Sequence, residues 1–372
     1  MDQQVEALIG ELLHDPANFV DPGAVLARID HPSCRWASVN SALRDPARLP
    51  PRMPEQQPMK DMFGRWMIYS RGEKHLQLRR RFSGYFGPRQ AESFRDTIEA
   101  RLGVVLDDVA PRGEMDVFTD VAQRITLPLI LDTMGIPSED RAGLTELLEI
   151  FEEAIPRQGD PEWVAKGEAA VGRIMDIFED YLAERRTHPQ DDFLTDLVRT
   201  PLGDHEEWRD VAANCLFLLS NAFGNTPTLV AGTIGLLLDN PEVAAAMQRG
   251  ELTLDQVTEE GARLLTPITY ALSAGDTDDD EWETHYLAAA NRDAQEFAAP
   301  DVFDPVRVPN RHLTFFVGPH ACLGASVAKL ITGVVAEQTL QRLPGLRRSG
   351  PPTWSAAAPL HRLAHLPVAW DV

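Results

Sequence analysis

The sequence predicts a mainly helical protein, because apolar residues recur at helical spacing along most of its 372 residues. A long helix is predicted from about residue 206 to residue 238, and a further helix begins at Ala325. One cysteine, Cys322, stands in a loop just before that second helix, between Gly318 and Gly324. We therefore expect a helical fold whose chemistry is centred on this loop.

The composition is that of an ordinary soluble globular protein, with 44% hydrophobic and 25% charged residues. The formal net charge of -22 argues against binding to nucleic acid or to an anionic membrane surface. The three cysteines, Cys34, Cys215 and Cys322, are odd in number and far apart, so we expect no disulfide framework. The first residues lack a signal-peptide pattern and no run of about 18 apolar residues is present, so we expect a cytoplasmic protein without a membrane anchor.

Taken in order, the N-terminal part predicts two helices and a loop. Helical patterns cover residues 2–14 and 37–43, whereas five prolines between residues 46 and 58 indicate a loop. The large, soft side chains between residues 59 and 67, ending at Met67, are suited to lining an apolar pocket. Ordinary core packing explains them equally well.

Residues 71–81 predict a helix with His75 and Arg79 four positions apart, and therefore on one face. Two cationic donors on one face suit a dianionic group, although a solvated basic patch is the commoner reason for such a charge run. Arg80, Arg81 and Arg89 form a basic island in an acidic chain, which suits an acidic protein partner.

Further helices are predicted over residues 91–135 and 141–187. The long helix at 206–238 carries Gly, Asn, Thr and Pro between residues 220 and 227, which predicts a kink in its middle. On the next predicted helix, Glu260 and Arg263 are three positions apart and can pair on one face.

The loop from Phe315 to Gly324 has more than one interpretation. The helix that follows presents free N–H groups and a dipole to Cys322, which favours a thiolate. A thiolate in an apolar loop suits a soft metal or a heme iron. The alternatives are a buried structural cysteine, a zinc site, or a nucleophile paired with His320. The chain has no C-x-x-C pair for zinc, and catalytic Cys/His pairs are usually distant in sequence.

The decapeptide F-x-x-G-x-H-x-C-x-G resembles the heme-binding loop of the cytochrome P-450 family, the heme-thiolate monooxygenases. The resemblance implies a thiolate-ligated heme b with Cys322 as the metal ligand. It also implies that Phe315 packs beside the ring and that His320 reaches a propionate. The residues it marks as cofactor-binding in this loop are Phe315, Gly318, His320, Cys322 and Gly324.

The same resemblance extends from about residue 36 to the end of the chain. His75 and Arg79 match the family's propionate-binding H-x-x-x-R, and Glu260 and Arg263 match its buried structural E-x-x-R pair. The long helix resembles the family's distal helix, which crosses the face of the heme. The residues expected to line a substrate pocket are Met67, Leu218, Ala222 and Ile268.

The distal helix departs from the family pattern A-G-x-acid-T-T. Ala222 and Thr226 match it, but Phe223 replaces Gly, Asn225 replaces the acid and Pro227 replaces the second Thr. Because Asn cannot titrate, proton delivery would rest on Thr226, water or the substrate. We therefore hypothesise atypical proton delivery, with Asn225 and Thr226 as the distal catalytic residues.

Two other departures are visible. Phe316 stands where the family often has glycine, and the family's longer hairpin with its propionate arginine is missing after Pro267, where an acidic run at 275–281 follows. The resemblance thus implies a mainly α fold with a small β sheet, shortened after the E-x-x-R helix, in a single domain over residues 1–372. Residues 359–368 would form its terminal hairpin.

The implied function is oxidation of a small-to-medium organic molecule by a heme-thiolate monooxygenase in specialised metabolite biosynthesis. A ferredoxin-type donor would supply electrons at the basic island, and no nucleic-acid or membrane partner is expected. The alternatives are a peroxide-using or non-redox heme enzyme that couples, rearranges or dehydrates its substrate, and a heme-binding protein without catalytic activity.

Overall fold

The computed structural model describes residues 21–48, 63–157, 159–274, 282–357 and 360–372. The helix predicted at residues 2–14, most of the proline-rich loop at 46–58 and the acidic run at 275–281 lie outside these residues. Within them, the predicted mainly α fold with small sheets is confirmed.

The α-helices are α2 (Pro22–Leu26), α3 (Trp36–Arg44), α5 (Gly72–Ser83), α6 (Pro88–Ser93), α7 (Arg95–Val109), α8 (Gln123–Met134), α9 (Ser138–Ala154), α10 (Pro161–Thr187), α11 (Phe193–Arg199), α12 (Trp208–Ser220), α13 (Thr226–Asp239), α14 (Pro241–Gln248), α15 (Leu254–Leu265), α16 (Leu287–Ala290) and α17 (Ala325–Arg342). The π-helical segments are η5 (Val117–Ala122) and η7 (Asn221–Asn225), and the 3-10 turns are η2 (Pro32–Cys34), η3 (Met67–Tyr69), η4 (Ala110–Arg112), η6 (Ile155–Arg157) and η8 (Gly318–His320). The strands are β1 (Glu114–Asp116), β2 (Ala271–Ala274), β3 (Trp282–His285), β4 (Arg347–Arg348), β5 (Thr353–Ala357), β6 (Leu360–His365) and β7 (Pro367–Ala369).

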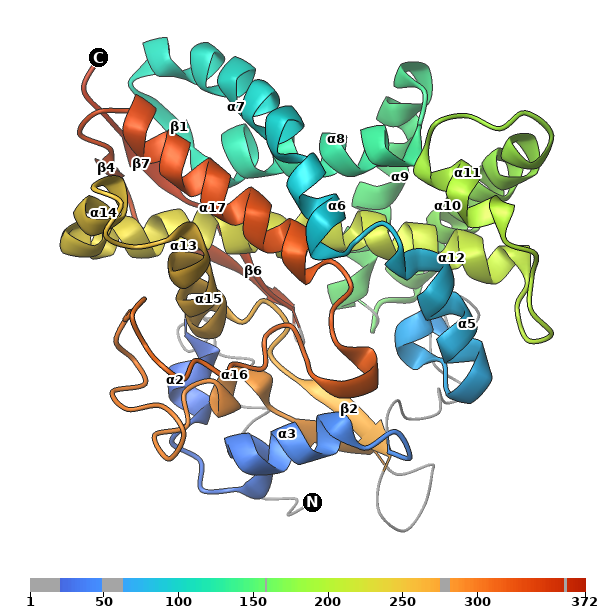
Figure 1. Ribbon diagram of the computed structural model, residues 1–372, viewed down its shortest axis with the longest axis horizontal. Helices are drawn as coiled ribbons and strands as arrows, with labels where there is room; N and C mark the ends of the chain where they lie inside the picture. The colour runs from blue at the N-terminus through green and yellow to red at the C-terminus, as the bar shows by residue number, and fades with distance from the viewer. Residues whose placement is uncertain (1–20, 49–62, 158, 275–281, 358–359) are drawn as a thin grey trace.

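The long helix predicted at residues 206–238 is the continuous run of α12, η7 and α13, which crosses the middle of the molecule (Figure 1). α15, α17 and η5 pack against α13, while α10 packs against α12. The predicted kink takes the form of the π-helical segment η7. Because α17 begins directly after the Cys322 loop, its packing against α13 fixes that loop relative to the long helix.

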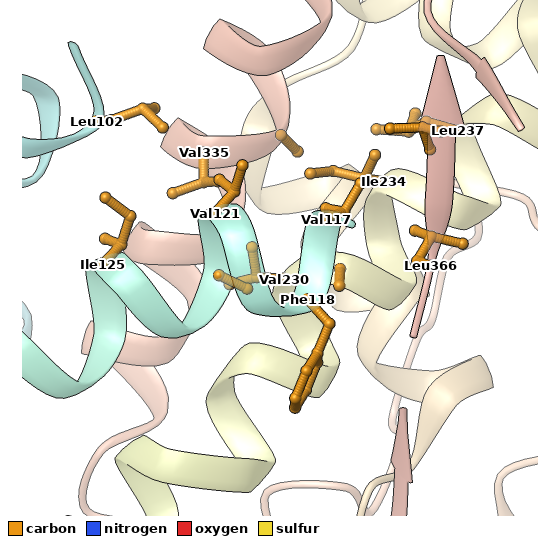
Figure 2. Close-up of a cluster of buried hydrophobic side chains, with 14 of the residues drawn as sticks. Leu102, Val117, Phe118, Val121, Ile125, Val230, Ile234, Leu237, Val335 and Leu366 are labelled. Atoms are coloured by element: carbon orange, nitrogen blue, oxygen red, sulfur yellow. The ribbon is translucent and has the colours of Figure 1, made fainter. Parts of the chain in front are cut away.

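An apolar core holds α13 in place. Val117 and Val121 of η5 lie beside Val230 and Ile234 of α13, with Val335 of α17 next to them (Figure 2). None of these five side chains is exposed. Because full burial of such a side chain is worth about 1.5–3 kcal/mol, this cluster fixes the spacing of the helices that frame the site.

A second apolar core joins α5, α8, α9, α10, α11 and α12. Phe82, Phe178 and Phe193 are fully buried there. It anchors α5, which carries His75 and Arg79, and α9, which packs beside the long helix. The first core therefore packs on α13 and the second on α12, so each half of the long helix has its own core.

None of the described helices alone is long and apolar enough to cross a membrane. The segments Trp208–Asp239 and Pro241–Gln248, bent by 106° at their junction, together have the length and apolar composition of a membrane span.

The described strands form small antiparallel sheets. β7 pairs with both β1 and β4, β2 pairs with β3, and β5 pairs with β6. The terminal hairpin predicted at 359–368 needs a correction, because the hairpin is β5–β6 and residues 367–369 leave it as β7. The chain changes partner at Leu366, whose N–H donates to Asp116 Oδ2 over 3.1 Å and whose carbonyl accepts from Val117 N over 3.0 Å.

Candidate active site

Backbone hydrogen bonds close the loop before α17. Cys322 N donates to Phe315 O over 2.8 Å, and Phe316 N donates to Leu313 O over 2.8 Å. Phe316 has a φ of 56°, in the left-handed region that costs a side-chain-bearing residue energy and that glycine adopts freely. The glycine that the family often has at this position is therefore the residue that this backbone conformation suits best.

The two motif glycines are held by different constraints. Gly318 has a φ of 74°, and a Cβ at this position would lie 2.8 Å from Leu43 O of α3, so the loop passes too close to α3 for any larger residue. Gly324 has a φ of -82°, and no atom lies within 4 Å of the position that its Cβ would occupy. Only Gly318 is thus required to be glycine by its protein surroundings.

Cys322 is the cysteine with accessible surface, whereas Cys34 and Cys215 are buried. Burial by dense surrounding protein is nevertheless the largest influence on Cys322 and raises the pKa of its thiol. The two observations together place the accessible face of the residue on an internal space. Hydrogen bonds from the backbone N–H groups of Gly324 and Ala325, and the positive charge of Arg79, act in the opposite direction and lower the pKa. These are the groups that stabilise a thiolate at the start of a helix.

Two basic side chains of α5 meet the cysteine loop. The ring of His75 lies 4.0 Å from that of His320, centroid to centroid, and His75 Nε2 lies 3.2 Å from Pro319 O. Arg79 Nη2 donates to Ala321 O over 2.7 Å. The structure thus brings together all three residues that the sequence assigned to the propionates.

This basic cluster has no acidic partner among the described residues, because no carboxylate there forms an ion pair or hydrogen bond with His75, Arg79 or His320. Burial, followed by the neighbouring His75 and Arg79, lowers the pKa of His320 to about 3. Three basic side chains packed together without a carboxylate make a binding site for an anion, because an anion would favour their protonated forms.

An apolar cavity lies between the long helix and α17. Its wall is formed mostly by aliphatic and aromatic side chains of α8, α12 and α17, with Thr226 on the same side of the long helix. The lining residues are Phe86, Phe94, Thr126, Leu129, Ile130, Thr133, Leu218, Asn221, Ala222, Thr226, Gly324, Val327, Ala328 and Ile331. Because Gly324 is part of the lining, the cavity reaches the cysteine loop.

The four residues predicted to line a substrate pocket divide into two pairs. Leu218 and Ala222 line the cavity. Met67 is 4% exposed and packs in the second apolar core, so the core-packing interpretation describes it better. Ile268 forms a β-bridge with Leu360 and packs on the cluster beside α3, away from the cavity lining.

Side chains of α8 satisfy the carbonyl groups that the π-helical segment frees. Pro227 has no N–H to donate to the carbonyl four residues before it, that of Phe223, and Gln123 Nε2 donates to this oxygen instead over 3.3 Å. Thr126 Oγ1 donates to Ala222 O over 2.7 Å. The widened turn is therefore supported by a neighbouring helix and is not a local disorder of the long helix.

The structure separates the two residues predicted to act on the distal side. Thr226 lines the cavity, but Asn225 is absent from its lining. The Asn225 side chain accepts a hydrogen bond from Arg362 Nε, and Arg362 in turn pairs with Glu152. The sequence reading missed Arg362 and Glu152, because they are 137 and 73 residues from Asn225 and belong to no local motif.

Glu260 and Arg263 form a fully buried ion pair, with Arg263 Nε and Nη2 donating to the two carboxylate oxygens over 2.8 and 2.7 Å. Arg263 Nη1 also donates to Asn291 O and Pro300 O over 2.8 and 2.7 Å. The pair thus ties α15 to the segment that leads toward the cysteine loop. It lies away from the cavity lining, as a structural role requires.

The hairpin after α15 is short and its described strands contain no arginine. The guanidinium near it comes from Arg48, which donates to Ala274 O over 3.4 Å and pairs with Glu283. On the same hairpin Ser273 Oγ lies 2.7 Å from His285 Nε2, and burial, with Arg48 nearby, lowers the pKa of His285 to about 4. Arg48 thus binds both strands of the hairpin, through Ala274 of β2 and Glu283 of β3.

The predicted basic island also needs a correction. Arg80 and Arg89 are exposed, but the Arg81 side chain is only 2% exposed and pairs with Glu206 over 2.7 Å. Its guanidinium also donates to the carbonyl groups of Thr200 and Pro201. Arg81 is therefore a structural residue that ties α5 to the start of α12.

These observations fit a heme. A sulfur supported by two N–H groups stands at an internal space, an apolar cavity reaches the same loop at Gly324, and a basic cluster without a described counter-charge contacts that loop. This combination offers a soft axial ligand, an apolar environment for a ring and cations for its acidic groups.

Comparisons with known proteins agree with this geometry. No family model matches the chain. It is 29% identical over 307 residues to a biotin-biosynthesis cytochrome P-450 of Bacillus subtilis (strain 168), covering 80% of this chain and 78% of the relative. It is 29% identical over 371 residues to the 20-oxo-5-O-mycaminosyltylactone 23-monooxygenase of Streptomyces fradiae, covering 94% of this chain and 84% of the relative. A myxobacterial cytochrome P-450 solved in complex with myristic acid superimposes with a TM-score of 0.85 at 26% identity, covering 97% of this chain and 99% of the other.

The fold and the site together define the class of this protein as a heme-thiolate oxidoreductase of the monooxygenase type. In sequence and in fold the chain is similar to bacterial cytochromes P-450.

Proposed function

We propose that the protein binds heme b through Cys322 and oxidises a small-to-medium, partly apolar organic molecule in specialised metabolism. The observation that carries the proposal is the position of Cys322, whose sulfur receives N–H groups of Gly324 and Ala325 at an internal space next to an apolar cavity. A thiolate-held heme supplies oxygen activation, because the electron-rich sulfur favours cleavage of the O–O bond. The biosynthetic names of the relatives support a role in specialised metabolism.

His75, Arg79 and His320 would hold the propionates. Their clustering without a described acidic partner supports this role, and Arg79 presents the planar fork of donors that suits a carboxylate. Phe315 packs against the apolar cluster that contains Leu265 and would shield the ligand from water. Gly318 lets the loop pass close to α3.

The cavity side of the long helix would face the substrate. Leu218 and Ala222 offer an apolar surface, and Thr226 offers a hydroxyl that can both donate and accept a hydrogen bond. We propose that Thr226, with water, holds the proton needed on the distal side, since Asn225 cannot titrate. Asn225 would contribute only through its hydrogen bonds.

The remaining parts of the proposal concern partners, location and domain organisation. Exposed Arg80 and Arg89 suit an acidic ferredoxin-type electron donor. The net charge of -22 disfavours nucleic acid and anionic membranes as partners, and a cytoplasmic location fits the sequence. We propose one heme domain over residues 1–372.

A second candidate function keeps the heme but takes its oxidant from peroxide, or uses no oxidant and couples, rearranges or dehydrates the substrate. The observation that favours it is the pairing of Asn225 with Arg362 and Asn221, which leaves no titratable side chain at the position of the family's acid. The two candidates differ in their need for electrons. Product formation that depends on a ferredoxin and its reductase supports the monooxygenase, whereas equal or faster turnover with peroxide supports the second candidate.

The first test is the absorption spectrum of the purified protein, ferric and then reduced under carbon monoxide. We expect the strongly red-shifted carbonyl band of thiolate ligation, and its loss in Cys322→Ser. Cys34→Ala is the matched control, because Cys34 is buried away from the loop and should leave the band unchanged. A wild-type protein without heme or without this band, or a Cys322→Ser variant that keeps it, would overturn the proposal.

A further inference from the structure

A buried ion pair lies against the π-helical segment of the long helix. Arg362 of β6 donates from Nη1 to Glu152 Oε2 of α9, and the two side chains are 13% and 5% exposed. Gly224 makes room for this pair, because a Cβ at that position would overlap the Arg362 guanidinium. The guanidinium can therefore pack directly on η7, because Gly224 has no side chain.

Arg362 also holds the side chain of Asn225. Its Nε donates to Asn225 Oδ1 over 3.1 Å, and Asn225 Nδ2 donates to Asn221 Oδ1 over 2.8 Å. Asn221 donates onward to Phe217 O over 2.6 Å and lines the cavity. A chain of hydrogen bonds therefore runs from a carboxylate on α9, through the guanidinium, to a side chain at the cavity wall.

The charged groups that face Asn225 within the described structure come from two elements. β6 supplies Arg362 and α9 supplies Glu152. The α8 side chains that contact η7, Gln123 and Thr126, are neutral and bind backbone carbonyl groups. Because an arginine stays protonated at every accessible pH, position 225 always faces a positive charge.

We propose that Arg362 is a positioning residue that takes position 225 out of proton delivery. This inference rests on the proposed function and deepens it. Glu152 holds the guanidinium, and the guanidinium turns the Asn225 amide so that its NH₂ group binds Asn221. A carboxylate placed at position 225 would meet the same Nε, form an ion pair and stay ionised, so that it would carry no proton. Restoring the family's acid therefore requires two substitutions, one at Asn225 and one at Arg362.

The test compares Asn225→Asp with Asn225→Asp/Arg362→Gln in the heme-loaded protein. The first readout is the infrared band of a protonated carboxyl group at neutral pH, together with the pH dependence of the ferric absorption spectrum from about pH 5 to about pH 9. Removing Arg362 also leaves the buried Glu152 carboxylate without its partner, so Arg362→Gln alone is the reference for the double variant. We expect neither the band nor a new titration in Asn225→Asp, and in the double variant a band and a titration that Arg362→Gln alone does not show. The second readout is product formed per electron, which we expect to rise about tenfold or more only in the double variant.

Two controls separate positioning from general loss of structure. Arg209→Gln removes the ion pairs of α12 with Asp176 and Glu179, which do not involve Asn225. The double variant Asn225→Asp/Arg209→Gln should therefore give the same two readouts as Asn225→Asp. Asn225→Asp/Arg362→Lys keeps a positive charge beside position 225, and it should again suppress the protonated band. Thermal unfolding of each variant shows whether it is folded.

Each outcome is decisive. A protonated carboxyl band in Asn225→Asp alone overturns the role of Arg362. So does a folded Asn225→Asp/Arg362→Gln variant with no band beyond that of Arg362→Gln alone. The infrared band does not depend on heme, so it can be read even if the carbonyl spectrum of the wild-type protein refutes the proposed function. The two failures are therefore distinguishable.

Discussion

The imidazole rings of His75 and His320 lie 4.0 Å apart, with their planes tilted by 50°. They join a helix near the start of the chain to the loop that carries Cys322, and Arg79 binds the same loop one helical turn further on. Basic side chains this close repel one another when charged. The arrangement becomes favourable when an anion lies among them.

We expect Arg79→Gln to weaken heme retention by about 10- to 100-fold, because a hydrogen bond to a charged group is worth about 1.5–3 kcal/mol. The measurement is the rate of heme transfer to an excess of a competing apoprotein. Arg80→Gln is the matched control, since Arg80 is the exposed neighbour on the same helix. Equal rates of heme loss from the two variants would show that Arg79 does not bind a propionate.

The two motif glycines should respond differently to alanine. Gly318→Ala places a methyl group 2.8 Å from Leu43 O at a φ of 74°, so we expect a loss of about 2 kcal/mol or more in unfolding free energy. Gly324→Ala has open space and a φ of -82°, and we expect less than about 1 kcal/mol. Denaturant unfolding measures both. Similar losses for the pair would show that the contact with α3 does not shape the loop.

Acid should destabilise the fold through Glu259. Burial is the largest single influence and opposes ionisation, but hydrogen bonds and charges of His312 and Lys329 outweigh it and lower the pKa of Glu259 to about 2. Because the folded-state pKa is depressed, the stabilisation is present above about pH 4.5 and is lost as the pH falls toward 2.

We therefore expect Glu259→Gln to cost on the order of 2 kcal/mol at pH 7 and progressively less between about pH 4.5 and 2. Unfolding at a series of pH values measures this. Glu242→Gln, at an exposed position, should follow the wild-type profile. A difference between Glu259→Gln and wild type that stays constant down to pH 2 would contradict the linkage.

Substituting two threonines of α13 should have different effects, one on product formation and the other on the free energy of unfolding. Thr226→Val removes the hydroxyl at the cavity, and we expect product formed per electron to fall about tenfold or more without a change in the carbonyl spectrum. Thr228→Val removes a buried hydroxyl that donates to Gly224 O and accepts from Leu363 N, and we expect a loss of about 1–3 kcal/mol in stability instead. An unchanged product yield in Thr226→Val would exclude Thr226 from the distal side.

The parts of the site that are continuous in sequence were predictable. The helix at Ala325, the cysteine loop before it and the kinked long helix each follow from a local pattern. Contacts between distant residues were not, because nothing in the sequence pairs Glu152 with Arg362, which are 210 positions apart.

Ambiguous side chains account for the other differences. Met67 is apolar and soft, properties that suit a pocket and a core equally, and only its 4% exposure decides for the core. Arg81 belongs to the same charge run as Arg80, but helical geometry turns it inward onto Glu206. Charge alone does not tell which side of a helix faces the protein.

Pro227 gives the distal helix a property that no ligand can alter. Because its ring nitrogen carries no hydrogen, Pro227 cannot donate the α-helical hydrogen bond to Phe223 O, and Gln123 donates to that oxygen instead. One hydrogen bond of this turn is thus ruled out by the polypeptide itself. We therefore expect the helix beside Thr226 to have the same shape in the protein without heme.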